Sequence, residues 1–134
     1  MEVVITTALV AILYAIAVPR FSEIRGPYAA RSGATQVASA FQAARMRAIA
    51  TNSSVRLTYN ATNGTYTIDR QLSGGGWNTD VRSQLPTGVS LSGVGTNPVF
   101  SRTGILNGNY TISVNAYGKS RTVTVNVLGQ TTVS

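Results

Sequence analysis

The chain has 134 residues, and its eleven Lys and Arg against four Asp and Glu give a net charge of +7. It contains no Cys and no His, which excludes disulfides, thiolate nucleophiles and metal sites built from those ligands, and removes the usual general base. Because its four acids are also scattered singly, we predict that the chain is not an enzyme and binds no metal or cofactor.

The N-terminal part is an apolar, uncharged run that begins after Glu2 and ends at Pro19. As a helix rising ~1.5 Å per residue, this run spans about 25 Å, just short of a bilayer core. A secretory signal has basic residues before its apolar part and a small-residue cleavage site after it, and neither is present here. We therefore expect the helix to stay on the mature protein and to loosen at Pro19, where one backbone hydrogen bond is lost.

The segment MEVVITTALVAILYAIAVPRF resembles the N-terminal signature of type IV pilins and type II secretion pseudopilins, with Glu2 and Pro19 at the family's spacing. In that family a prepilin peptidase cuts before the apolar segment and the new N-terminus is methylated. The segment anchors the subunit in the inner membrane and later packs in the core of a helical filament. The resemblance implies that Glu2 neutralises the N-terminal amine of a neighbouring subunit. The alternative is an ordinary membrane anchor with a chance glutamate.

A second helical pattern runs from residue 31 to residue 51. Its apolar residues recur at spacings of four, three and four, which places Val37, Phe41, Ala44 and Ala48 on one face, with Ile49 beside them. This pattern predicts a stem helix that packs on a sheet through that face. Between the two helical segments, Gly26-Pro27 is expected to bend the helix or to add a brief irregular turn.

Alternating apolar and polar residues predict strands after the helix. Val55–Tyr59 and Tyr66–Ile68 alternate on either side of Asn63-Gly64, and an Asn-Gly pair in this position is a strong hairpin signal. A short strand is expected around Val99-Phe100. Near the C-terminus, two more alternating runs, over residues 110–116 and 123–127, are expected to be joined by a turn at residues 117–120.

These patterns predict an α+β fold, with a long N-terminal helix packed on an antiparallel β-sheet head. We expect three segments: a hydrophobic membrane or filament-core helix over 1–26, an amphipathic stem helix over 27–53, and a β-rich head over 54–134. The passage from Ala38 to Asn52 is similar to the helix-to-first-strand passage of H-type pseudopilins and FimT-like minor pilins.

Basic residues are concentrated in two places. Arg20, Arg25 and Arg31 follow the apolar run, where they are expected to face lipid headgroups or acidic groups of neighbouring subunits. On the head, Gly118-Lys119-Ser120-Arg121 is similar to a basic glycine motif of DNA-binding FimT-like minor pilins, which implies phosphate contacts by Lys119 and Arg121. A solvated or subunit-facing basic surface is the alternative.

The resemblance implies a structural subunit that polymerises through its N-terminal helix into an extracytoplasmic filament. Two alternatives remain open: a low-copy minor pilin or type II secretion pseudopilin, and a DNA-binding minor pilin in natural transformation. The implied partners are further copies of the chain, other pilin-like subunits, prepilin peptidase and the assembly machinery. The implied location is the inner membrane before assembly, then an extracellular pilus or a periplasm-spanning pseudopilus.

Overall fold

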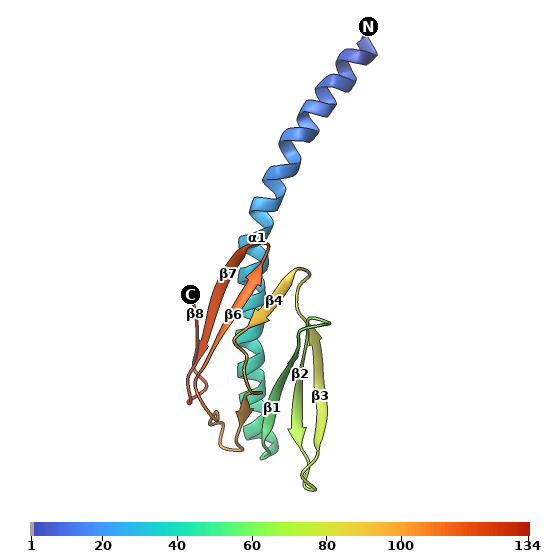
Figure 1. The fold of residues 1–134 in the computed structure, drawn as a ribbon. Coiled ribbons are helices and arrows are strands. Elements are labelled where there is room, and N and C mark those ends of the chain that lie inside the picture. Colours follow the sequence, from blue (N-terminus) through green and yellow to red (C-terminus); the bar gives the residue numbers. More distant parts are fainter. Residues whose placement is uncertain (1) are drawn as a thin grey trace.

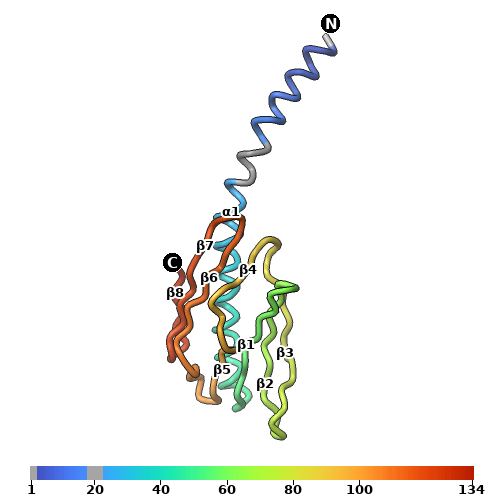
Figure 2. Tube along the Cα trace, viewed as in Figure 1, coloured from blue at the N-terminus to red at the C-terminus, as the bar shows by residue number. Residues whose placement is uncertain are grey.

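A computed structural model gives the fold of the chain, and it describes the side chains of residues 3–17 and 23–134. One long helix, α1 (Glu2–Thr51), is followed by strands that alternate with short turns (Figures 1 and 2). The strands are β1 (Val55–Asn60), β2 (Thr65–Gln71), β3 (Trp77–Gln84), β4 (Val89–Ser92), β5 (Val99–Phe100), β6 (Tyr110–Ala116), β7 (Lys119–Val125) and β8 (Thr131–Val133).

The strands form two antiparallel four-stranded sheets, with the orders β3-β2-β1-β5 and β4-β6-β7-β8. Both sheets lie against the C-terminal half of α1, whereas its N-terminal part extends beyond them (Figure 1). The predicted α+β fold class is therefore confirmed. The prediction of a single sheet is wrong, because after β3 the chain enters the second sheet at β4, returns to the first at β5, and leaves it again at β6.

The core lies between α1 and the two sheets. The buried positions of the helix begin well before the predicted stripe and are mostly small, which lets the sheets approach its backbone closely. At Gly33 the helix backbone comes close to the second sheet: a Cβ added there would lie 2.8 Å from Cγ1 of Val89 and 3.0 Å from Cγ1 of Val114. The fully or nearly buried apolar side chains of α1 belong to Ala30, Ala34, Val37, Ala40, Phe41, Ala44 and Ala48, and Gly26 and Gly33 are buried as well.

The hairpin turns follow the local chemistry of their residues. Between β1 and β2, Oδ1 of Asn60 accepts hydrogen bonds from the backbone N–H groups of Thr62 and Asn63, and Gly64 has a φ of 60°. Between β6 and β7 the turn is shorter than the predicted 117–120. Tyr117 and Gly118 alone form it, with φ values of 48° and 74°, as a two-residue type I′ turn requires, so Lys119 already belongs to β7.

Three other expectations need correction. Of the bend or irregular turn expected at Gly26-Pro27, the irregular turn is not seen, since α1 is helical through both residues. Pro27 removes a single backbone donor, and Gly26 is buried against the β6–β7 turn. Ile49 is 52% exposed rather than part of the buried face. The last alternating run ends as a strand at Val125, and Val127 lies in the following loop. No described helix combines the length and the hydropathy that a bilayer span requires.

Candidate functional site

The N-terminal part of α1 presents an unpartnered apolar surface. Its large apolar side chains between Val3 and Ile16 are 56 to 75% exposed. The hydroxyl of Thr7 donates to the backbone carbonyl of Val3 at 2.8 Å, so this polar atom is already satisfied within the helix. Such a surface is suited to packing against lipid or other helices. The side chains of Glu2 and Pro19, both predicted assembly residues, lie outside the described residues.

The predicted stem residues lie at the interface between α1 and the sheets. Val37, Phe41, Ala44 and Ala48 are at most 3% exposed. The ring of Phe41 meets that of Phe100 on β5 edge to face, with 6.2 Å between the ring centroids. These residues act by holding the head on the helix.

A narrow apolar crevice separates the two sheets. Across it, the backbone N–H of Leu91 on β4 donates to Oη of Tyr59 on β1 at 3.3 Å. The enclosed space is about 10 Å³, which has room for one water at most. Neither a ligand nor a side chain of a partner protein can enter it unless the sheets move apart. Its apolar lining consists of Val37, Ala40, Phe41, Leu57, Tyr59, Tyr66, Leu91, Val94 and Ile112.

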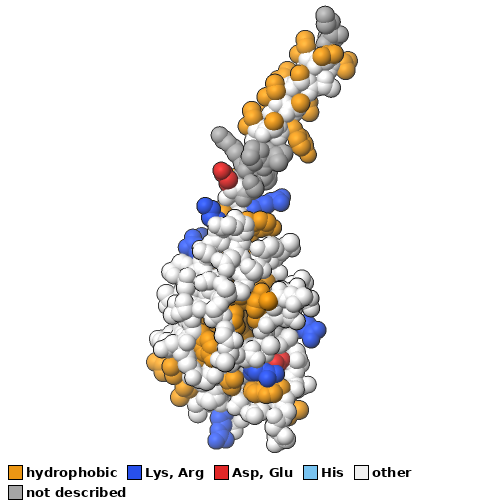
Figure 3. Space-filling model, viewed as in Figure 1, with side chains coloured by type: hydrophobic (Ala, Val, Ile, Leu, Met, Phe, Trp, Pro, Cys, Tyr) orange, Lys and Arg blue, Asp and Glu red, His pale blue; other side chains and the backbone are white. Residues whose placement is uncertain are grey.

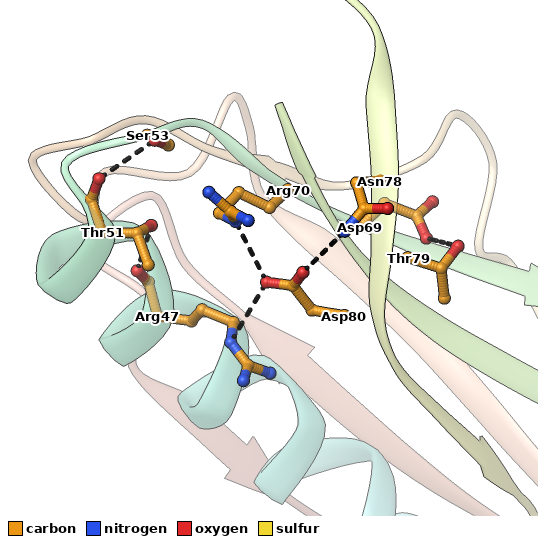
Figure 4. A network of polar contacts seen from close by, with 8 residues as sticks. All are labelled: Arg47, Thr51, Ser53, Asp69, Arg70, Asn78, Thr79 and Asp80. Carbon is orange, nitrogen blue, oxygen red and sulfur yellow. Dashed lines mark hydrogen bonds and ion pairs between the residues drawn. The ribbon is translucent and has the colours of Figure 1, made fainter. Parts of the chain in front are cut away.

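A polar network joins the distal end of α1 to the first sheet (Figure 4). The carboxylate of Asp80 on β3 lies 3.2 Å from Nε of Arg70 on β2 and 3.4 Å from Nε of Arg47 on α1. Its second oxygen accepts a hydrogen bond of 3.1 Å from the amide of Asn78. Asp80 is therefore shared between a strand and the helix, a contact that no local sequence pattern indicates.

Asp69 on β2 is buried, and its carboxylate accepts hydrogen bonds from side chains of the two neighbouring strands, β1 and β3. Nε and Nη2 of Arg56 donate to its Oδ2 at 3.2 and 3.0 Å, and the hydroxyl of Thr58 donates to the same oxygen at 3.2 Å. The hydroxyl of Thr79 donates to Oδ1 at 2.9 Å. Burial raises the pKa of Asp69, but these hydrogen bonds outweigh it and hold the pKa below its ordinary value. The guanidinium of Arg56 also lies 4.4 Å from the centroid of the Trp77 ring.

The remaining charges of the described residues are strongly unbalanced. Asp69 and Asp80 are taken up in ion pairs with Arg56, Arg47 and Arg70. Among the described acids this leaves Glu23, which is exposed. Exposed basic residues outside any ion pair of the described chain are Arg25, Arg31, Arg82, Arg102, Lys119 and Arg121.

The predicted DNA contacts, Lys119 and Arg121, occupy the start of β7. The strand alternates, and Val123 and Val125 on the same face are buried toward α1. Lys119 lies against the helix, since a Cβ added to Gly26 would be 3.0 Å from its Cγ. Both residues therefore lie at the end of the head where the apolar part of α1 emerges, not at its distal end. The described residues hold no cluster of three potential metal ligands.

The fold is similar to that of solved minor pilins and pseudopilins. The minor pseudopilin EpsH of the type 2 secretion system of Vibrio cholerae matches with a TM-score of 0.65 and 15% identity over 78% of this chain and 95% of that chain. The type IV minor pilin FimU of Pseudomonas aeruginosa matches with a TM-score of 0.65 and 14% identity over 78% and 87%. At these identities the likeness shows the fold alone.

Sequence comparison extends this to a family. No curated protein matches the chain at the level of sequence. Residues 33–129, most of the chain, match the family model described as type II transport protein GspH. The pilin and pseudopilin resemblance predicted from the sequence is thereby confirmed. The chain belongs to the GspH family of type II transport proteins, and the family and the fold together place it among the pseudopilins.

Proposed function

We propose that this chain is a low-copy minor subunit of a type II secretion pseudopilus or of a related type IV pilus. Pseudopilins are structural rather than enzymatic proteins, and EpsH and FimU, whose solved structures resemble this chain, are both described as minor subunits. The family match therefore favours the minor-subunit alternative over our main sequence prediction, a homopolymer-forming subunit.

The charge distribution is the single observation that carries this proposal. In a homopolymer, copies would meet through surfaces that each carry unpaired Arg and Lys but, among the described residues, only Glu23 as an unpaired acid. Two like charges about 10 Å apart in water repel by about 0.4 kcal/mol, and such terms add over many contacts. A single copy among acidic neighbours is attracted to them, whereas identical copies repel one another. The proposed partners are therefore other pilin-like chains with acidic flanks.

Assembly is the proposed mechanism. The exposed apolar side chains of α1 are held by the inner membrane before assembly and by neighbouring helices afterwards. Glu2 pairs with the N-terminal amine of a neighbour, because an unpaired carboxylate in an apolar core costs about 2.5–3.5 kcal/mol or more. Pro19 marks the place where α1 loosens in the assembled state. In this proposal the head ends in the periplasmic pseudopilus or on a surface pilus, after processing by prepilin peptidase.

Quantitative mass spectrometry of sheared filaments and of the cell envelope tests the copy number. Every pilin-like chain is counted against this one in both fractions. We expect this chain at a small fraction of the most abundant pilin-like chain, together with it in the same complexes. A filament composed mainly of this chain would contradict the proposal.

DNA binding remains a separate prediction, because Lys119 and Arg121 are exposed and unpaired within the described chain. If they contact phosphates, replacing both with Ala lowers the DNA affinity and reduces the slope of log K against log salt concentration by about two. Arg82→Ala with Arg102→Ala removes the same charge elsewhere and serves as the control. Equal DNA affinity of the two double variants would show that Lys119 and Arg121 are not the DNA-binding residues.

A further inference from the structure

Four basic residues surround α1 where its apolar part meets the head. Arg25 and Arg31 lie exposed on the helix, and Lys119 and Arg121 on β7 flank the same stretch; we call these four residues the basic collar. The contact between Lys119 and Gly26 joins its two halves. Figure 3 shows Lys and Arg side chains on both sides of the helix where it meets the head.

Exposed apolar and aromatic side chains accompany the collar. Ile24 is 59% exposed, Tyr28 72% and Tyr117 56%, each beside a residue of the collar or one to three positions from it in the sequence. Amphipathic aromatic rings next to cationic side chains are the composition found at membrane–water interfaces. Tyr117 is held in position by its turn, with a positive φ, and its ring packs on Gly88.

We propose that the basic collar is a docking surface for anionic phospholipid headgroups, which holds the head against the membrane before assembly. This inference rests on the proposed insertion of the apolar part of α1 into the inner membrane. From Ala17, α1 rises ~12 Å to Arg25 and ~21 Å to Arg31, so Arg25 lies just outside a bilayer that ends near Ala17 and the rest of the collar lies farther out. Helix side chains lean toward the N-terminus, so Arg25 and Arg31 incline toward that bilayer.

Charge complementarity decides the occupant. In the described chain, the nearest acid outside an ion pair is Glu23, so the collar carries a net positive charge toward the surface it faces. A leaflet rich in anionic lipid attracts basic residues close to the bilayer and does so within about one Debye length. For a basic residue at the bilayer surface the attraction amounts to about a fivefold change in the docked population, and it is smaller for residues farther out.

Fluorescence quenching in vesicles tests the docking with the full chain. The chain has no Cys, so Ser32→Cys beside Arg31 takes a single fluorophore, and Ser73→Cys at the distal end of the head takes the reference one. Vesicles of phosphatidylcholine, alone or mixed with phosphatidylglycerol, carry a quencher on a headgroup. We expect stronger quenching at position 32 in the anionic vesicles, abolished by high salt, and no change at position 73.

A matched pair of charge variants separates the collar from net charge. Lys119→Gln with Arg121→Gln removes two collar charges, and we expect the docked-to-undocked ratio to fall on the order of twentyfold. Arg82→Gln with Arg102→Gln leaves the same net charge and should retain the docking. Equal quenching at position 32 in both vesicle types, or equal loss in both double variants, would overturn the docking surface.

The two proposals fail in different ways. If the chain co-floats with neutral vesicles but quenching at position 32 does not depend on anionic lipid, the collar is refuted and the proposed membrane insertion is retained. A chain that fails to float with neutral vesicles refutes the insertion on which both the assembly mechanism and the collar rest. Competition by DNA but not by anionic lipid at the collar would assign these residues to nucleic acid instead.

Discussion

Nε of Arg47 on α1 lies 3.4 Å from Oδ2 of Asp80 on β3, and this ion pair ties the edge strand of the first sheet to the helix (Figure 4). In the described chain β3 makes no close backbone approach to α1, whereas every other strand does. A side-chain contact therefore carries a connection that backbone packing provides elsewhere. Asp80 also pairs with Arg70, so one carboxylate fixes β2, β3 and the helix together.

Removing the charge of Asp80 should loosen this connection. We expect Asp80→Asn to lower the free energy of unfolding by about 1 kcal/mol, because two partly exposed ion pairs are lost at once. Urea denaturation followed by circular dichroism measures the change. Glu23→Gln, which removes an exposed acid outside any ion pair, is the control and should leave the stability unchanged. Equal stability of the two variants would show that the ion pairs of Asp80 contribute nothing measurable to the free energy of unfolding.

The lowered pKa of Asp69 makes the free energy of unfolding depend on pH in the acidic range. Its folded-state pKa lies below the ordinary value of 3.8, so its contribution is fully present above that pH and is lost as the pH falls through the folded-state pKa. We expect urea midpoints to be flat near about pH 6 and to fall below about pH 4. Asp69→Asn should reduce this decline while lowering the midpoint at neutral pH, and an unchanged decline would assign it to other groups.

Gly33 should resist substitution even though it lies inside a helix. Ala normally favours a helix over Gly by about 1 kcal/mol, but here its methyl group would lie 2.8 Å from the stiff side chain of Val89. We expect Gly33→Ala to lower the free energy of unfolding by roughly 1–2 kcal/mol. Gly74, which has nothing within 4 Å, is the control position. A stabilised Gly33→Ala protein would contradict the close approach of helix and sheet.

Phe41 should be the most costly side chain of the stem to shorten. It is fully buried and packs against Phe100, so Phe41→Ala leaves a cavity and should cost about 3–5 kcal/mol. Met46 lies on the same helix but is 70% exposed, and Met46→Ala should cost little. Thermal unfolding of the two variants compares them directly, and a cost below that of Met46→Ala would place Phe41 outside the core.

Glu2→Ala tests the assembly role that the family resemblance implies. The variant should still insert in the inner membrane, because its apolar residues remain, but should enter filaments or pseudopili poorly. Fractionation of membranes and sheared filaments gives both quantities. Conservative Glu2→Asp keeps the charge and should retain part of the assembly. Normal incorporation of the Ala variant would refute the pairing of Glu2 with a neighbour.

Local chemistry made part of the fold predictable. The Asn63-Gly64 signal correctly placed the β1–β2 hairpin, and continuing its register pairs Arg56 with Asp69, as observed. This pairing is therefore predictable from the hairpin register, although Arg56 and Asp69 are 13 residues apart in the sequence. The buried small residues Ala30, Gly33 and Ala34 share the helical spacing of the predicted stripe and extend it toward the N-terminus.

The remaining structure depends on contacts far apart in the chain. β3 has few apolar residues and little alternation, because it is an edge strand with both faces partly wet, and its pairing with β2 stabilises it. β4 and β8 are too short to show a period. Tyr117 adopts a positive φ, which the residue type does not predict because tyrosine rarely takes this conformation. The division into two sheets follows from where β4 and β5 pair, which no local pattern specifies.

The seam between the sheets has a mechanical consequence. Where β1 faces β4, the described chain has the Tyr59–Leu91 hydrogen bond in place of a ladder, and α1 carries both sheets. A force applied along α1 reaches each sheet separately, through small side chains loaded in shear. Where β1 faces β4, a sideways force meets this one hydrogen bond and an apolar crevice, whereas Asn107 in the β5–β6 loop is hydrogen-bonded to both Val99 and Tyr110. The head is thus expected to be stiffer along the direction of the proposed extraction from a membrane than across this seam, where β1 and β4 can part while every strand keeps its partners.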